Sequence, residues 1–148
     1  MEFKKEIANN LNQLLEKNYD AEKGYKDAAD KVQNTRMKLF LEEQAQLRYD
    51  FGHQIKSEIK AFDGEVDKGG SVKGSMHRAW MDLKSAVSSD KEENVMEEVQ
   101  RGEQSAIEEY NEVINKSNLP ATTKDVLTQQ RDKIQQAQQS AKNWEIVS

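Results

Sequence analysis

Two acidic residues stand where the pattern of the sequence calls for apolar ones. Glu22 falls within a stripe of apolar side chains that recur every three or four positions along residues 4–32. Glu103 holds the centre of a similar stripe along residues 90–116. A carboxylate that enters a helical core needs a partner, because an unpaired buried charge is costly or takes up a proton. Such carboxylates either hold divalent metal ions or pair with a buried cation.

Other polar residues share these inward faces when positions are counted at about 100° per residue. The predicted buried polar layer consists of Asn18, Glu22, Gln44, Arg48, Glu103, Gln130 and Gln138. If the chain folds back on itself near residues 34 and 118, Glu22 comes level with Arg48. Glu103 then lies at a similar height, half-way along the bundle. The sequence therefore predicts two carboxylates and one guanidinium at the centre of the molecule.

Two interpretations of this layer differ in their chemistry. In the first, Glu22 and Glu103 are ligands of a di-iron or di-manganese centre, which in four-helix bundles also needs Glu-x-x-His from each of the other two helices. The chain has no Glu-x-x-His, and the nearest fragment, Asp50-Phe51-Gly52-His53, points His53 outward. In the second, Arg48 bridges the two glutamates and the glutamines complete the hydrogen bonds. Too few metal ligands are present, which favours the second interpretation, in which the polar layer is structural. We therefore expect no cofactor; in the alternative, metal-binding interpretation the cofactor is iron or manganese.

Long helices must position these residues. Four apolar stripes predict helices at about 4–32, 36–62, 90–116 and 121–145. The short breaks at 33–35 and 117–120 indicate that the first two and the last two helices form antiparallel hairpins. Strand patterns are missing, because no sustained two-residue alternation occurs.

The connection between the hairpins is different in kind. Residues 63–88 are too many for a tight turn; they begin with a glycine-rich stretch and then carry a short amphipathic piece at about 75–87. Such a length can return along the whole bundle. The sequence thus predicts a single domain over residues 1–148. Its fold class is all-α: a ferritin-like four-helix bundle whose hairpins are joined by a long crossover carrying a short extra helix.

Glycines and one tryptophan near the predicted layer carry a further expectation. Gly24, Gly52 and Gly102 lie inside helices, where each is about 1 kcal/mol less favourable than Ala. They indicate either a close approach of helices or room for another group. Trp80 is expected to anchor the crossover on the bundle, because a large apolar ring gains most from burial.

The composition narrows the classes of function. The 22 basic and 27 acidic residues give a net charge of −5 and are interspersed, which argues against a nucleic-acid partner or a polybasic membrane anchor. No apolar run approaches the roughly 18 residues that span a bilayer, and the start of the chain lacks a signal-peptide core. The absence of Cys excludes disulfides and thiolate chemistry. We therefore expect a cytoplasmic protein.

Several stretches resemble one known family. They are Leu11 to Leu15 with Gly24-Tyr25, the crossover run Gly74 to Ala86, and Arg101-Gly102-Glu103 with Tyr110. The chain resembles the uncharacterised bacterial four-helix-bundle proteins of the ferritin-like superfamily, a domain of unknown function, over about residues 8–145. The resemblance implies a ferritin-like bundle and no particular reaction. Where such proteins lead us to expect a histidine on the last helix, this chain has Gln138, which weakens a metal assignment.

These observations predict a non-catalytic bundle that acts through protein–protein association, with a homo-oligomer as the expected form and neither nucleic acid nor membrane as a partner. The alternative is a di-metal carboxylate protein, with iron or manganese held by Glu22 and Glu103. A storage or scaffold role carried by the outer face is a third interpretation, for which the sequence offers no residue to test.

Overall fold

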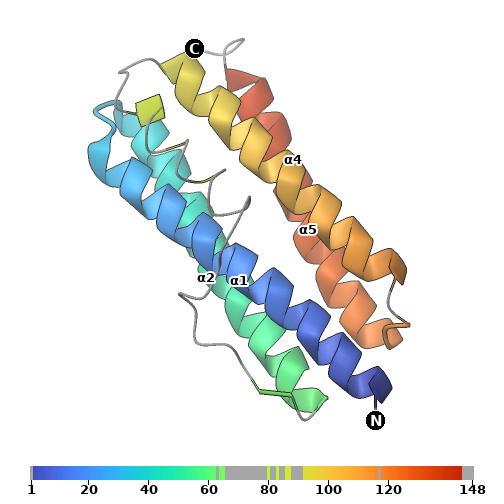
Figure 1. Ribbon diagram of the computed structural model, residues 1–148. Helices are drawn as coiled ribbons and strands as arrows, with labels where there is room; N and C mark the ends of the chain where they lie inside the picture. Colours follow the sequence, from blue (N-terminus) through green and yellow to red (C-terminus); the bar gives the residue numbers. More distant parts are fainter. Residues whose placement is uncertain are drawn as a thin grey trace.

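Long α-helices form almost all of the part of the chain that the computed structural model describes, which comprises residues 2–62, 64–65, 80, 83, 86–87, 92–116 and 118–144. Helix α1 spans Glu2–Lys31 and α2 spans Thr35–Ala61, and together they make one hairpin. Helix α4 spans Glu92–Lys116 and α5 spans Ala121–Lys142, and they make the other (Figure 1). The prediction of an all-α fold with two helical hairpins is confirmed.

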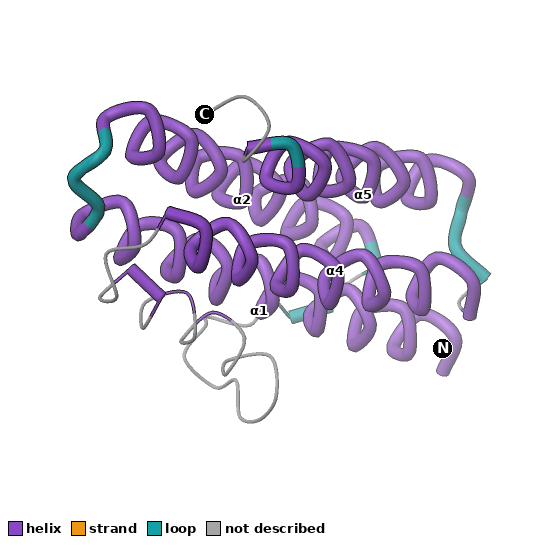
Figure 2. The backbone as a smooth tube through the Cα atoms, turned by 90° about the horizontal axis from the view of Figure 1, so that it is seen from above, coloured by secondary structure: helices purple, strands orange, loops and turns teal. Residues whose placement is uncertain are grey.

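The turns of the two hairpins lie at opposite ends of the bundle (Figure 2). Asn34 closes the first turn, because its side-chain Oδ1 accepts a hydrogen bond of 2.9 Å from the backbone N–H of Met37 at the start of α2. Pro120 precedes the first residue of α5, where its missing N–H leaves no hydrogen bond unmade. The observed helix ends fall within three residues of those predicted.

Contacts between the hairpins establish the direction of each helix. Asn18 of α1 bonds Tyr110 of α4, and further along Gly24 and Gly102 lie against the same side chain, so α1 and α4 are antiparallel. Because α2 is antiparallel to α1, helices α2 and α4 run parallel. The last residue of α2 and the first residue of α4 therefore lie at opposite ends of the bundle. The short extra helix predicted at about 75–87 lies for the most part outside the described residues, and no such helix stands among the described elements.

The core is divided into two apolar halves. One half contains the buried residues of α1 from Ile7 to Leu15 together with Phe51, Ile55 and Ile59 of α2. The other contains Ala21 to Ala29 of α1 and Met37 to Ala45 of α2. On each of these two helices a polar residue, Asn18 or Arg48, stands between the two apolar runs. The polar side chains therefore form a layer across the middle of the bundle, as the periodicity predicts.

The buried residues of the connecting segment belong to the second of these apolar halves. Trp80, Leu83 and Val87 are all buried there, next to Ala28 of α1 and Val99 of α4. This agrees with the prediction that Trp80 anchors the crossover on the bundle. None of the described helices combines the length and the apolar character needed to cross a membrane.

Candidate functional site

An ion pair lies at the centre of the bundle. The guanidinium of Arg48 on α2 donates through Nη2 to Oε1 of Glu103 on α4, and the two side chains are 1% and 0% exposed. Both residues project from the inward faces that the apolar periodicity defines. The pair joins the first hairpin to the second across the core.

Hydrogen bonds extend from this pair to all four helices. Arg48 Nη1 donates to Oδ1 of Asn18 at 3.2 Å, and Nδ2 of Asn18 donates to the hydroxyl of Tyr110 at 2.8 Å. The Tyr110 hydroxyl donates to Oε1 of Gln130 on α5 at 2.8 Å. Gln130 Nε2 returns to α2, where it bonds Oε1 of Gln54 at 2.8 Å. We call the residues Asn18, Arg48, Glu103, Tyr110 and Gln130 the buried polar network.

Tyr110 was not among the polar residues that the sequence analysis selected. Its ring counts as apolar in a periodicity argument, so hydropathy places it with the apolar residues of its helix. The signal was present nevertheless, because a buried tyrosine hydroxyl needs a hydrogen-bond partner and Tyr110 lies two turns beyond Glu103 on the same face. Burial raises the pKa of Tyr110 to about 12, so its hydroxyl keeps its proton over the physiological pH range.

Aromatic rings cover the ion pair on its other side. The Trp80 ring packs against the ring of Tyr25 with centroids 4.9 Å apart, and the guanidinium carbon of Arg48 lies 5.9 Å from the Trp80 centroid. A Cβ atom on Gly24 or on Gly102 would come within 2.9 Å of Trp80. Two of the three helical glycines therefore make room for this indole. Gly52 does not, because a Cβ there would lie 3.6 Å from Leu15 and 4.0 Å from Tyr19.

Burial dominates the electrostatics of the pair. It raises the pKa of the Glu103 carboxyl above its ordinary value, and the positive charge of Arg48, which acts in the opposite direction, offsets only part of the effect. Burial likewise holds the pKa of Tyr25 well above its usual value, and the nearby charge of Glu103 adds to this shift. Compared with water, the site therefore shifts both groups toward their neutral forms.

Hydrogen bonding around the pair is uneven. Toward Asn18 and Tyr110 the bonds continue from helix to helix. On the side of Tyr25, the hydroxyl of that residue interacts with the Glu103 carboxyl, and Nε of Arg48 is buried without a hydrogen-bond partner. The polar contacts on this side therefore end at Tyr25, whereas those on the other side reach Gln130 of α5.

Glu22 differs from the prediction. Its side chain is 17% exposed and accepts a hydrogen bond of 2.8 Å from Nζ of Lys26, one turn further along α1. The prediction that Arg48 bridges two glutamates is therefore wrong in this part, because the pair that Arg48 makes is with Glu103. The long side chain of Glu22 extends from the edge of the apolar stripe to a solvated lysine, where its charge keeps contact with water.

The remaining predicted members of the layer lie nearer its edge. Gln138 is only partly buried and donates to Oε1 of Gln104 at 2.8 Å, which links α5 to α4 outside the core. Gln44 is buried, but its Oε1 has no hydrogen-bond partner. Neither residue takes part in the buried polar network.

These residues do not fit a di-metal centre. The carboxylate of Glu103 is paired with Arg48, whose positive charge repels a cation, and Glu22 is paired with Lys26. Within the described ranges, no three His, Cys, Asp or Glu side chains are grouped so that they could hold a metal ion. His53 packs its ring edge-on against exposed Tyr49, with centroids 4.5 Å apart, and His77 lies outside the described residues.

A comparison with protein families shows which family the chain matches. A family described as a domain of unknown function (DUF2383) matches residues 6–116, which is well over half of the chain. The chain belongs to this family. The DUF2383 match contains Arg48, Glu103 and Tyr110 and ends at the last residue of α4, so that Gln130 on α5 lies beyond it. No curated protein matches the chain.

Proposed function

We propose that this member of the DUF2383 family is a non-catalytic bundle of ferritin-like architecture that acts by associating with other protein chains, in the first place with copies of itself. The observation that carries this proposal is the pairing of Glu103 with Arg48. A catalytic acid or a metal ligand must meet a substrate or an ion, but this carboxylate is fully buried and its charge is balanced by a guanidinium. The chemistry left to the core is structural.

The network has a structural task to perform. Apolar side chains tolerate small shifts along a helix, whereas hydrogen bonds between Asn18, Tyr110 and Gln130 tolerate few. A polar layer that joins four helices can thus specify which helices pair and at what height, a role known for some buried polar groups. In this proposal the core fixes the heights of the four helices relative to one another, and the outer surface of the bundle makes the contacts with other chains.

The direction of the helices supports the ferritin-like part of the proposal. Two antiparallel hairpins with α2 parallel to α4 require a long connection between the second and the third long helix. Bundles of the ferritin-like class have one such crossover. An up-and-down bundle with short loops throughout would instead have α2 antiparallel to α4.

Metal analysis tests the non-catalytic part. The protein is purified without chelator and analysed for iron and manganese before and after loading with each ion. We expect no tightly bound equivalent per chain in either state. Two equivalents per chain would favour the di-metal alternative centred on Glu22 and Glu103. A parallel sample of Arg48→Met separates the alternatives further, because removing the guanidinium should improve metal uptake only if these carboxylates are ligands.

Light scattering over a range of protein concentrations tests the association. We expect a mass of at least twice the 17.0 kDa of one chain. A mass of one chain at the highest concentration would contradict self-association.

A further inference from the structure

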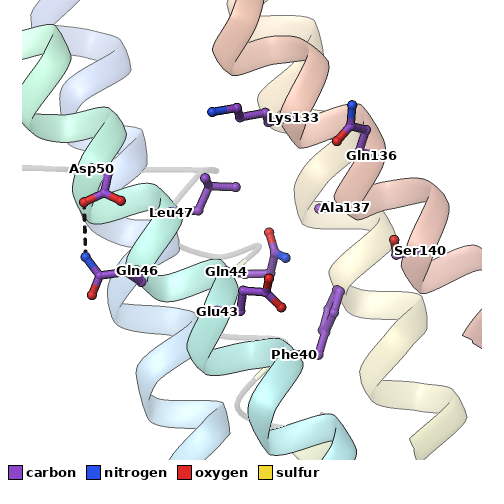
Figure 3. Close-up of a pocket in the computed structure, with 10 residues that line it drawn as sticks. All are labelled: Phe40, Glu43, Gln44, Gln46, Leu47, Asp50, Lys133, Gln136, Ala137 and Ser140. Carbon is purple, nitrogen blue, oxygen red and sulfur yellow. Dashed lines mark hydrogen bonds between the residues drawn. The ribbon is translucent and has the colours of Figure 1, made fainter.

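The two hairpins meet on two sides of the bundle, and the space between the helices is filled on one side and open on the other. Between α1 and α4, the indole of Trp80 fills the space left by Gly24 and Gly102. Between α2 and α5 a groove of about 600 Å³ remains open (Figure 3). One side of the core is thus covered by this chain's own tryptophan, and the other is a surface between helices.

The groove has an apolar floor with one unsatisfied polar atom. Phe40 and Leu47 of α2 face Ala137 of α5 across it (Figure 3). Gln44 extends toward α5 between them, and its Oε1 is buried without a hydrogen-bond partner. Contact with another protein would remove the apolar area of this surface from water and could supply a hydrogen-bond donor to the unpaired oxygen. Both effects favour association at the groove.

The shape of the groove favours a macromolecule over a small ligand. Its volume falls within the range of about 300 to 1,000 Å³ typical of ligand pockets, but such pockets bury at least about 70% of the ligand. Here most lining side chains, among them Glu43, Asp50 and Lys133, are exposed. A small molecule would therefore remain largely in water.

Charges on the two rims of the groove are opposite. Glu43 and Asp50 stand on the α2 rim, and Lys133 stands on the α5 rim. The contacts of Gln130 with Gln54 and of Trp144 with Phe40 set the register of α2 against α5 and bring Lys133 level with Phe51, the residue after Asp50. No ion pair joins Lys133 to Asp50 within the chain among the described residues.

We infer that this face, formed by α2 and α5, is the interface of a two-fold symmetric dimer in which α2 of each copy packs on α5 of the other. The two-fold axis runs along the bundle, so that Lys133 of each copy meets Asp50 of the second copy at the same height. This inference rests on the proposed function and names the surface that serves it. Each dimer contains the pair twice, as an isologous interface requires.

The opposite two-fold arrangement is disfavoured by charge. If the axis ran across the bundle, α2 would lie on α2 of the second copy, and Glu43 and Asp50 of one chain would face the same acids of the other. Like charges in an interface are unfavourable. In that arrangement α5 would lie on α5 of the second copy, so Lys133 would not meet Asp50. The repulsion between the acids would then have no attraction to offset it.

The size of the face is sufficient. Helices of 27 and 22 residues are about 40 Å and 33 Å long, and two neighbours about 10 Å apart present a face roughly 20 Å wide. Such a face covers about 650 Å² per copy, near the roughly 600 Å² at the lower end of stable interfaces.

Charge reversal tests the pairing directly. Lys133→Glu and Asp50→Lys are each measured by sedimentation equilibrium, and we expect each to raise the dissociation constant of the dimer at least about tenfold, because two attractions become two repulsions. The variant that carries both changes should regain the dimer, since every reversed charge again faces its opposite. Lys124→Glu, an equal charge change on α5 at a residue that does not line the groove, should leave the dimer intact.

Other outcomes overturn the inference in distinguishable ways. A wild-type dimer that neither reversal weakens would place the interface elsewhere and leave the proposed association standing. Two weakened single variants without recovery in the combined variant would exclude the packing of α2 on α5. A wild-type protein that stays monomeric at all concentrations would overturn the interface and self-association together. Circular dichroism of each variant at low concentration checks that the fold is retained.

Discussion

Arg48 and Glu103 form an ion pair between α2 and α4 with both side chains almost completely removed from water. Pairs of this kind are weak evidence for stability, because desolvating two charges can offset their attraction. Their removal is nevertheless asymmetric in its effect. Deleting one partner leaves the other charge buried alone, whereas replacing both leaves an ordinary apolar contact.

The variant Arg48→Met should therefore be strongly destabilised at neutral pH. Breaking a buried pair typically lowers the free energy of unfolding by about 3 to 5 kcal/mol. Acidification should relieve part of this loss. Burial raises the pKa of Glu103, and without Arg48 only Tyr25 still lowers it, so the contribution of this carboxyl to stability is greatest below the ordinary value of 4.5 and falls as the pH rises through the higher pKa of the folded state. Urea unfolding at pH 7 and pH 5 measures both effects.

Two control variants test whether the loss of stability in Arg48→Met comes from the unpaired buried charge. Lys26→Met breaks the exposed pair with Glu22 and should change the free energy of unfolding by less than about 1 kcal/mol. Arg48→Met combined with Glu103→Leu should recover most of the stability, since no charge remains buried. An Arg48→Met variant as stable as Lys26→Met would contradict the structural role of the pair.

A comparison of wild type with Glu103→Gln decides whether burial or Arg48 controls the carboxyl. If burial prevails, the folded state binds the Glu103 proton more tightly than the unfolded state does. The advantage of wild type over Glu103→Gln in unfolding free energy then shrinks as the pH rises above about 4.5, by about 1.4 kcal/mol for each unit of pKa shift. The measurement is urea unfolding of both proteins from pH 4 to pH 8. An advantage that grows with pH would mean that Arg48 prevails.

Most of the fold and part of the candidate site can be predicted from the apolar periodicity of the sequence. Regular steps of three and four residues determine where the four long helices lie, and the short breaks at 33–35 and 117–120 determine that they pair as hairpins. The same steps orient Arg48 and Glu103 inward, because the direction of a Cα–Cβ bond follows from its position along a helix. These inferences need no knowledge of side-chain conformation.

Partner choice could not be predicted in this way. Glu22 has Lys26 and Arg48 as candidate partners, and the outcome depends on how far its flexible side chain extends toward water. Tyr110 was hidden for a related reason, because hydropathy describes its ring and not its hydroxyl. The purpose of Gly24 and Gly102 was left open between close helix contact and room for a group, since nothing in their spacing indicates that one distant tryptophan packs against both.

Removal of the Tyr110 hydroxyl should weaken the link between α1 and α5. The hydroxyl accepts from Asn18 and donates to Gln130, and in Tyr110→Phe the buried Oε1 of Gln130 loses its donor. Leaving a buried group unsatisfied costs about 1 to 3 kcal/mol, and we expect a loss of that size in urea unfolding. Tyr49→Phe, at a ring that is 47% exposed, is the matched control and should change stability by no more than about 0.5 kcal/mol. Equal effects of the two changes would contradict the assigned hydrogen bonds.

The effect of a Gly→Ala substitution on stability should differ in sign between Gly52 and the glycines that face Trp80, because the neighbouring atoms differ. Alanine in a helix is favoured over glycine by up to about 1 kcal/mol, so Gly52→Ala, whose new Cβ meets Leu15 at an ordinary 3.6 Å and Tyr19 at 4.0 Å, should stabilise the protein by about that amount. Gly102→Ala places its Cβ 2.9 Å from the Trp80 ring and should instead destabilise it by about 1 to 3 kcal/mol.

Thermal and urea unfolding of the two variants, each made also in a Trp80→Ala background, measure the difference. With the indole removed, the steric conflict disappears and only the helix preference remains, so Gly102→Ala should become stabilising while Gly52→Ala keeps its sign. Gly24→Ala should likewise destabilise the wild-type protein, but its nearest contact, at 2.9 Å, is Cβ of Trp80. Trp80→Ala retains that atom, so the conflict at Gly24 should persist in this background. If Gly102→Ala stabilises the wild-type background, the indole does not occupy the space between α1 and α4.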